Sequence, residues 1–209
     1  MEKVTRITAT ACPLPAENID TDQILPARFL KLPRDGKHGE VLFRDLRFDA
    51  AKNEIPEFPL NRPALRQAKI IVAGTNFGGG SSRESAVYAL YDYGIRCVIA
   101  PSFGDIFSQN SAKNGLLTAL VTEAECDALV AALERVPTLP ITVNLEAQTI
   151  VCGNLSFNFS IDPARRARLL NGWDDIDLTN SFRDQIDTFK AAHGRQQFWS
   201  VPIPGGSSE

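Results

Sequence analysis

The sequence contains few of the side chains that bind transition metals in proteins. Its 209 residues include two histidines and four cysteines, and no two cysteines form a Cys-x-x-Cys pair. Zinc and iron–sulfur sites need closely spaced ligands, so a metal site made by this chain alone is not expected. We predict that the cysteines are small hydrophobic residues, with Cys97 in a buried strand and Cys126 on a helix. The other two are Cys12 and Cys152.

The two histidines, His38 and His193, stand in no recognisable catalytic motif. The sequence therefore offers no convincing Ser-His-Asp triad. A serine hydroxyl is a weak base by itself. If a serine of this chain does chemistry, its activation must come from local electrostatics or from another chain.

Long apolar runs and an excess of basic charge are also missing. No apolar stretch approaches the length that crosses a bilayer, and the first residues lack the apolar core of a signal peptide. The formal net charge is −3, which gives little support to RNA binding. We expect a cytoplasmic protein that folds as one domain over residues 1–195, with a loose tail at 196–209.

The most informative stretch is 69–86, Lys-Ile-Ile-Val-Ala-Gly-Thr-Asn-Phe-Gly-Gly-Gly-Ser-Ser-Arg-Glu-Ser-Ala. Its apolar run at 70–73 predicts a buried strand. The glycines that follow allow positive φ angles and a close approach of backbone to a ligand. We predict that Ser81 or Ser82 caps the next helix, whose free N–H groups, with Arg83 beside them, would suit a carboxylate or phosphate.

Two familiar phosphate-binding motifs do not fit this stretch. No Gly-Lys-Ser/Thr follows the glycines, which excludes a P-loop, and the glycine spacing of the dinucleotide fingerprint also fails. The remaining alternative is a tight strand-to-helix turn whose serines only cap the helix. Consecutive glycines followed by two hydroxyls and a guanidinium favour a ligand site, but they do not name the ligand.

The centre of the chain alternates strands and helices, which predicts an α/β fold with parallel strands and right-handed crossovers. Short strands with turn signals between them then predict an antiparallel meander, and Asp162-Pro163 predicts the start of the last helix. A weak alternation at 4–10 predicts a further strand. The other expected strands are 70–73, 96–101, 116–121, 141–145, 149–152 and 155–161, and the expected helices start near 82 and span 104–114 and 123–135.

Two polar segments precede this core. The segment 18–26, Asn-Ile-Asp-Thr-Asp-Gln-Ile-Leu-Pro, is typical of an Asx-type turn, and its two carboxylates could also orient a partner or substrate. Residues 27–48 are rich in charge and contain Pro33, Gly36 and Gly39, which predicts a flexible loop. This loop could be a lid over an acidic substrate or a solvated surface loop.

Several of these motifs together resemble a known family, in the same order and over nearly the whole chain. The chain resembles the small subunits of 3-isopropylmalate dehydratase, in the aconitase superfamily. The motifs that carry this resemblance are 18–26, Asn-Phe-Gly-Gly-Gly-Ser-Ser-Arg-Glu at 76–84, Ile-Ala-Pro-Ser-Phe-Gly-Asp-Ile-Phe at 99–107, Asn-Gly-Leu-Leu at 114–117, Phe-Ser-Ile-Asp at 159–162, Arg165-Arg166 and Asn171-Gly172.

The resemblance implies a fold and a reaction. The fold would be that of the aconitase swivelling domain, a mostly parallel central sheet flanked by helices, with an antiparallel meander. The activity would be that of a hydro-lyase, active only with a large subunit that carries a [4Fe-4S] cluster, while this chain binds no cofactor. The substrate would be a small hydroxy dicarboxylate, isomerised between 2- and 3-isopropylmalate by dehydration and rehydration in leucine biosynthesis.

The resemblance also implies roles for particular residues. Ser81 would be the catalytic base that takes a proton from carbon. The substrate would be bound by Gly79, Gly80, Ser82 and Arg83. Selection of the substrate's side chain would fall to a specificity loop that contains Arg28, Phe29, Leu30 and Lys31.

Two departures from the family pattern bear on the substrate. Ser85 stands where the family usually has His or Gln, and residues 29–39 differ from the usual loop, which contains Arg-Thr-Gly. Related small subunits act on 2-methylmalate (citraconate), dimethylmalate or homoaconitate, and these are the alternative substrates. A non-catalytic domain that binds an anion or a protein through residues 74–84 is the alternative from another functional class.

Overall fold

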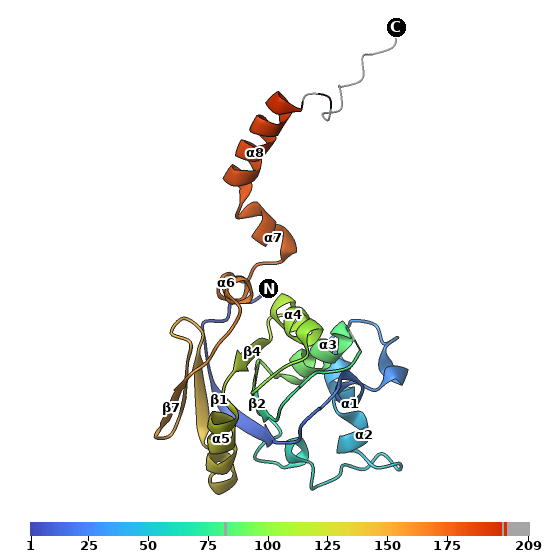
Figure 1. Cartoon of the computed structure of the whole chain (residues 1–209). Coiled ribbons are helices and arrows are strands. Elements are labelled where there is room, and N and C mark those ends of the chain that lie inside the picture. The colour runs from blue at the N-terminus through green and yellow to red at the C-terminus, as the bar shows by residue number, and fades with distance from the viewer. Residues whose placement is uncertain (82, 198, 200–209) are drawn as a thin grey trace. The chain divides into compact units, whose positions relative to one another are not determined.

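Four short strands pair in parallel at the centre of the fold in the computed structural model, which describes residues 1–81, 83–197 and 199 (Figure 1). They are β1 (Arg6–Leu14), β2 (Ile70–Ala73), β3 (Cys97–Ala100) and β4 (Leu117–Leu120). Strands β2 and β3 are buried along their whole length, as expected for parallel strands covered on both faces. The meander β5 (Pro140–Asn144), β6 (Thr149–Cys152) and β7 (Leu155–Asn158) completes a seven-stranded sheet in the order β4-β3-β2-β1-β5-β6-β7.

Strand β1 joins the parallel and antiparallel halves of this sheet. Its first five residues, from Arg6, pair antiparallel with β5, and its last four, from Ala11, pair in parallel with β2. The sequence predicts only the first half, at 4–10. The second half includes Cys12 and Pro13 and lacks the β-branched alternation that marks a strand.

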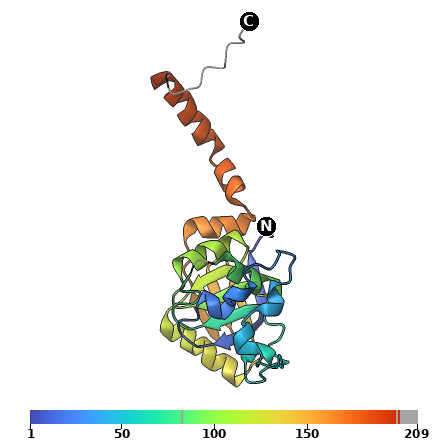
Figure 2. The same ribbon diagram turned by 90° about the vertical axis from the view of Figure 1, so that its right-hand side faces the viewer.

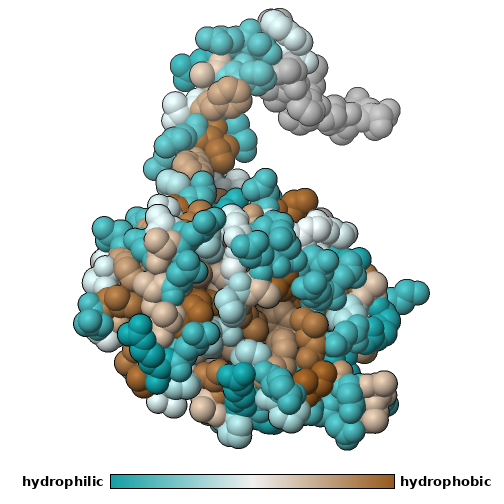
Figure 3. Space-filling view, turned by 60° about the horizontal axis from the view of Figure 1, so that its bottom comes forward, coloured by the Kyte–Doolittle hydropathy of each residue, from teal (hydrophilic) through white to brown (hydrophobic). Residues whose placement is uncertain are grey.

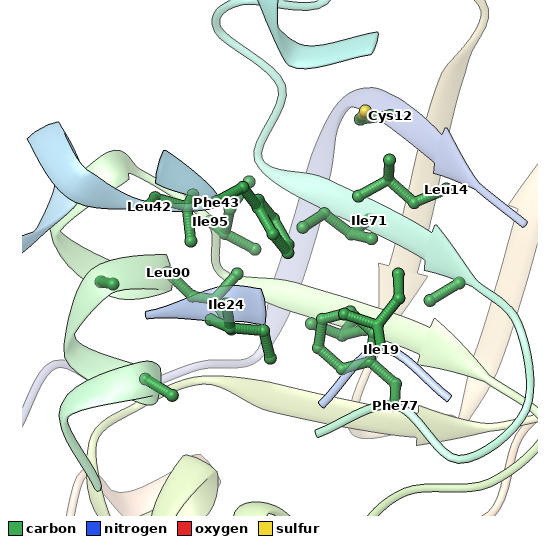
Figure 4. Close-up of a cluster of buried hydrophobic side chains, with 14 of the residues drawn as sticks. Cys12, Leu14, Ile19, Ile24, Leu42, Phe43, Ile71, Phe77, Leu90 and Ile95 are labelled. Atoms are coloured by element: carbon green, nitrogen blue, oxygen red, sulfur yellow. The ribbon is translucent and has the colours of Figure 1, made fainter. Parts of the chain in front are cut away.

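Helices cover both faces of the parallel strands, and the strand residues alternate between the two faces. On one face, Ile71 and Val98 pack with Ala86 and Leu90 of α3 (Glu84–Tyr93). Figure 4 shows Ile71, Leu90 and their labelled neighbours in this buried cluster. On the other face, Ile70, Val72, Cys97 and Ile99 pack with Leu129 and Leu133 of α5 (Glu123–Arg135) and with the inner side of the meander.

The fold class predicted from the sequence is confirmed. Strands β2 and β6 and helix α5 have the predicted bounds, and the other predicted core elements begin or end within a few residues of their predicted limits. Asp162 caps α6 through the backbone N–H groups of Ala164 and Arg165, with Pro163 in the first turn, as predicted. Residues Met1–Gly172 form the first of two compact units. The remaining helices of this unit are α1 (Thr21–Ile24), α2 (Arg44–Arg47), α4 (Asp105–Lys113) and α6 (Pro163–Asn171), with 3-10 turns η1 (Ala27–Phe29), η2 (His38–Val41) and η3 (Pro59–Asn61).

The predicted last helix, α6, is followed by two more helices. Gly172 ends α6 in the left-handed conformation, at φ 69°, and a second compact unit begins at Trp173. This unit contains α7 (Asp175–Asn180) and α8 (Arg183–Gln196). The two helices carry few apolar residues at helical spacing, so periodicity does not reveal them. The predicted extent of one domain, 1–195, stays a prediction, and most of the predicted tail at 196–209 lies outside the described residues.

The face of the first unit drawn in Figure 3 has hydrophilic residues over much of its area and hydrophobic residues among them, several near its centre. Figure 2 shows the helices that cover the sheet from a second side. Within the part of the chain that the structure describes, no helix has both the length and the apolar character needed to cross a membrane.

All four cysteines are buried free thiols, as predicted for Cys97 and Cys126. Burial raises the pKa of Cys12 to about 12 and that of Cys126 to about 11, and it raises those of Cys97 and Cys152. Because the reactive and metal-binding form of cysteine is the thiolate, these side chains are inert near neutral pH. They serve as packing residues of the core.

The raised thiol pKa values predict that the fold loses stability at alkaline pH. Above about pH 9 an unfolded thiol releases its proton while the folded thiol keeps it, so the free energy of unfolding falls as pH rises. The thiols of Cys12, Cys97 and Cys126, whose pKa values are raised most, should each contribute a loss of about 1–2 kcal/mol by pH 10. Urea unfolding at pH 7.5 and pH 10 measures this loss. Cys97→Ala should lose less stability between these pH values than the wild type, and identical losses would contradict the prediction.

Candidate functional site

The candidate site lies at the carboxyl ends of the parallel strands. Residues 15–20 follow β1, residues 74–83 follow β2, and residues 101–104 follow β3. Because adjacent parallel strands end at one edge of the sheet, these three segments meet there, where open α/β sheets commonly bind ligands. Isolated bridges join Asp20 to Gly79 and Phe77 to Phe103. Motifs that are far apart in the sequence therefore form one loop cluster.

The segment 18–22 holds the glycine loop through its backbone. The Gly78 N–H donates to the Ile19 carbonyl at 2.7 Å, and the Thr21 N–H donates to the Gly79 carbonyl at 3.0 Å. The buried Thr21 hydroxyl donates to the Ser81 carbonyl at 2.8 Å. These hydrogen bonds fix the backbone on both sides of Gly80 and leave Ser81 exposed.

The same segment also engages the Arg83 guanidinium. Asp22 forms an ion pair and a hydrogen bond with Arg83, whose side chain is only 17% exposed. Asp20 caps α1, because its carboxylate accepts from the Gln23 N–H at 2.7 Å. The two carboxylates therefore have separate structural roles, one in an Asx-type cap and one as the partner of Arg83.

The prediction that a serine caps α3 is wrong for Ser81. Helix α3 begins at Glu84, and its N-cap residue is Arg83, with extended backbone and no hydrogen bond from a capping side chain. The polar segment 18–22 competes for the serine backbone and keeps Ser81 outside the helix. Ser82, predicted to cap the helix and to bind substrate, lies outside the described residues.

Two glycines of the loop are required by its geometry. Gly78 has φ +72°, and a Cβ built there would lie 2.2 Å from the Phe107 ring. Gly104 lies so close to the glycine loop that a Cβ built on it would be 2.4 Å from the Gly78 carbonyl oxygen. Gly80 has φ +85° but more space, with its nearest neighbour, Asp20 Cβ, at 3.5 Å from a built Cβ. The glycine run thus combines left-handed backbone with tight contact to the α4 segment.

The predicted specificity residues lie in and after η1. Arg28 pairs with Asp45 of α2, and its guanidinium carbon lies 4.7 Å from the centroid of the Phe29 ring. Leu30 is 41% exposed, and Lys31 is also exposed. Arg28 and Phe29 line a cavity of about 420 Å³ together with residues of α2 and the loop after it. The predicted flexible loop therefore includes short helical turns with defined contacts.

Among residues 1–81, 83–197 and 199, no group of three or more His, Cys, Asp or Glu side chains could hold a metal ion. The four thiols are buried and protonated at neutral pH. Strand β2 separates Cys12 of β1 from Cys97 of β3. The cysteines thus do not fit the closely spaced thiolates that hold an iron–sulfur cluster.

The sequence is similar to proteins of known family. Residues 1–124 match the family described as Aconitase C-terminal domain, and residues 127–163 match the family described as LeuD_N. A 3-isopropylmalate dehydratase small subunit from Rhodospirillum centenum is 48% identical over 96% of this chain and 100% of its own length. The protein of the same name from Paracoccus denitrificans is 46% identical over 95% of this chain and 100% of its own length.

The chain belongs to the family of 3-isopropylmalate dehydratase small subunits. A solved structure of 3-isopropylmalate dehydratase from Methanocaldococcus jannaschii has the same fold. Its TM-score is 0.61, with 24% identity, and the match covers 88% of this chain and 99% of that one.

For this small subunit, the structure brings some of the predicted site residues together. Gly79, Gly80, Ser81 and Arg83 lie on one loop beside the segment 18–22. Within the described part of the chain, no hydrogen bond or ion pair joins these four residues to the residues from Arg28 to Lys31, and Arg28 pairs with Asp45 instead. Sequence reasoning missed Thr21, because a buried threonine that donates to a distant carbonyl leaves no local pattern.

The glycine geometry predicts unequal effects of two alanine substitutions. Gly78→Ala combines left-handed strain with overpacking against Phe107 and should lower the free energy of unfolding by about 2–5 kcal/mol. Gly80→Ala adds only the backbone strain, about 1–2 kcal/mol. Urea unfolding of the isolated subunit measures both. Equal losses would contradict the role given to the contact with Phe107.

Proposed function

We propose that Ser81 of this chain is the base of a hydro-lyase whose active site is completed by a large subunit. The substrate is 3-isopropylmalate, the acid in the names of the curated relatives. The observation that carries the proposal is the exposed Ser81 on a backbone held from both sides by the segment 18–22. A side chain on a fixed backbone can meet a reacting atom with little loss of conformational freedom.

In the dehydration step, the Ser81 alkoxide takes a proton from the carbon next to the one that bears the hydroxyl group. The C–H electron pair becomes the second bond of a carbon–carbon double bond, and the C–O bond breaks with loss of hydroxide. The product is isopropylmaleate. Addition of water in the opposite sense, with return of the proton from Ser81, places the hydroxyl on the neighbouring carbon.

The surroundings of Ser81 support this role electrostatically. Arg83 is two residues away, and its positive charge favours an alkoxide and a substrate carboxylate at the same loop. Asp22 holds the guanidinium and thereby limits its freedom before substrate binds. Gly79 and Gly80 carry no side chains, so their backbone can approach a carboxylate closely.

We expect the residues that hold the iron–sulfur cluster to lie on a second polypeptide. This chain offers no cluster ligands among its described residues, so we place the [4Fe-4S] cluster on the large subunit. When bound there, it would supply a Lewis acid for the departing hydroxide. Ile106, in the first turn of α4 and two residues after Gly104, is 47% exposed. An exposed hydrophobic side chain at this edge suits the docking of a partner.

Ser81→Ala should lower the turnover of 3-isopropylmalate by at least about 100-fold, because it removes the proton acceptor. The measurement uses the small subunit paired with its cognate large subunit after anaerobic cluster reconstitution, with isopropylmaleate followed by ultraviolet absorbance. Assembly of the two subunits should be unchanged.

Ser156→Ala is the matched control, because Ser156 is an exposed serine of β7 in the antiparallel half of the sheet. It should turn over substrate like the wild type. Normal turnover by Ser81→Ala would remove Ser81 as the base. Wild-type preference for 2-methylmalate or homoaconitate would keep the mechanism and overturn the proposed substrate.

A further inference from the structure

Arg34 connects the loop after η1 to the helix that follows the candidate site. Its guanidinium carbon lies 3.4 Å from the centroid of the Tyr88 ring in α3. Its Nη2 group donates to Asn114 Oδ1 at 3.2 Å. A planar guanidinium that stacks on a ring and donates through its edge uses two features that lysine lacks.

Asn114 links Arg34 to the first turn of α3. Asn114 Nδ2 donates to Glu84 Oε1 at 2.8 Å and to the Asn110 carbonyl at 2.9 Å. Burial raises the pKa of Tyr88, and the neighbouring Glu84 carboxylate raises it further. Glu84 is the first residue of α3, three positions after Ser81. A series of hydrogen bonds thus runs from Arg34 through Asn114 to Glu84, which lies next to the glycine loop.

The same loop is attached to the structure on both sides of its exposed part. On the far side, the His38 N–H donates to Asp92 Oδ2 at 3.3 Å, and a Cβ on Gly39 would lie 2.5 Å from the Tyr93 nitrogen. On the near side, Arg28 pairs with Asp45. Residues 30–37 between these attachments are exposed. Among them, Arg34 contacts Tyr88 of α3, so it sets where residues 30–33 lie relative to this helix.

We propose that Arg34 is a positioning residue that fixes residues 30–33 against α3 and thereby sets how strongly the enzyme discriminates between substrate side chains. This inference rests on the proposed function, because it needs a substrate at Ser81, and on the predicted specificity loop that contains Leu30 and Lys31. Arg34 acts through Tyr88, Asn114 and Glu84 and does not touch the reacting atoms. Its loss should therefore raise KM for the larger substrate and leave kcat nearly unchanged.

The test compares 3-isopropylmalate with 2-methylmalate, whose side chain is smaller, in the reconstituted two-subunit enzyme. Arg34→Ala and Arg34→Lys should each reduce the ratio of the two kcat/KM values by about three- to tenfold, through KM for 3-isopropylmalate. Arg34→Lys keeps the charge but loses the planar face, so it should resemble Arg34→Ala.

Arg96→Lys is the matched control, because the Arg96 guanidinium carbon lies 3.7 Å from the ring centroid of Tyr91 in the same helix. It removes an arginine–tyrosine contact from α3 without touching the loop and should leave the substrate ratio unchanged. An equal loss of kcat for both substrates in the Arg34 variants, with the ratio intact, would overturn the inference. So would wild-type behaviour of Arg34→Lys.

Hydrogen exchange in the isolated small subunit provides a second measurement that does not require activity. Amides of residues 30–32 and 34–37 should exchange about three- to tenfold faster in Arg34→Lys than in the wild type, while amides of β2 and β3 keep their rates. Unchanged exchange at 30–37 would overturn the inference. If the reconstituted wild-type enzyme turned over neither substrate, that result would count against the proposed function. Failure of the proposed function and failure of this inference are therefore distinguishable.

Discussion

The hydrogen bonds between the segment 18–22 and the glycine loop are the constraint on which the candidate site depends. A loop that contains three consecutive glycines has many accessible backbone conformations, and fixing it has an entropic cost. Three hydrogen bonds and one ion pair from Ile19, Thr21 and Asp22 select a single conformation. The Asp-Thr-Asp motif and the Gly-Ser-Ser-Arg-Glu motif are thus two parts of one structural unit, although about 60 residues separate them.

This constraint also changes the role of the helix that follows. A helix that began at a capping serine would direct its free N–H groups at the ligand. In this chain α3 begins at Glu84, so its first turn carries a carboxylate. Arg83, which the sequence predicts beside those N–H groups, supplies a positive charge near Ser81, and Asp22 holds its guanidinium.

Much of the α/β core could be predicted from the sequence, because its signals are local. The apolar run at 70–73, the alternation of strands and helices, and the Asp162-Pro163 start of α6 all match the structure. Long-range pairing could not be read in the same way. Whether Ala11–Leu14 pairs with β2 depends on contacts across the sheet, and the Thr21 hydrogen bond to Ser81 depends on where two distant segments meet. Helices α7 and α8 were missed because their few apolar residues give little helical periodicity.

The most direct measurement is amide hydrogen exchange of Gly78 in the isolated small subunit, compared between wild type and Thr21→Val. The Gly78 N–H is bonded to the Ile19 carbonyl, so its exchange rate reports whether the segment 18–22 still holds the loop. Valine keeps the shape of threonine and removes the hydroxyl bonded to Ser81. If this segment positions the site, Gly78 should exchange at least about fivefold faster in the variant, a change of about 1 kcal/mol typical of one lost hydrogen bond. Amides of β2 should keep their protection. An unchanged Gly78 rate in a folded variant would contradict the claim that the Thr21 hydroxyl helps to hold the glycine loop.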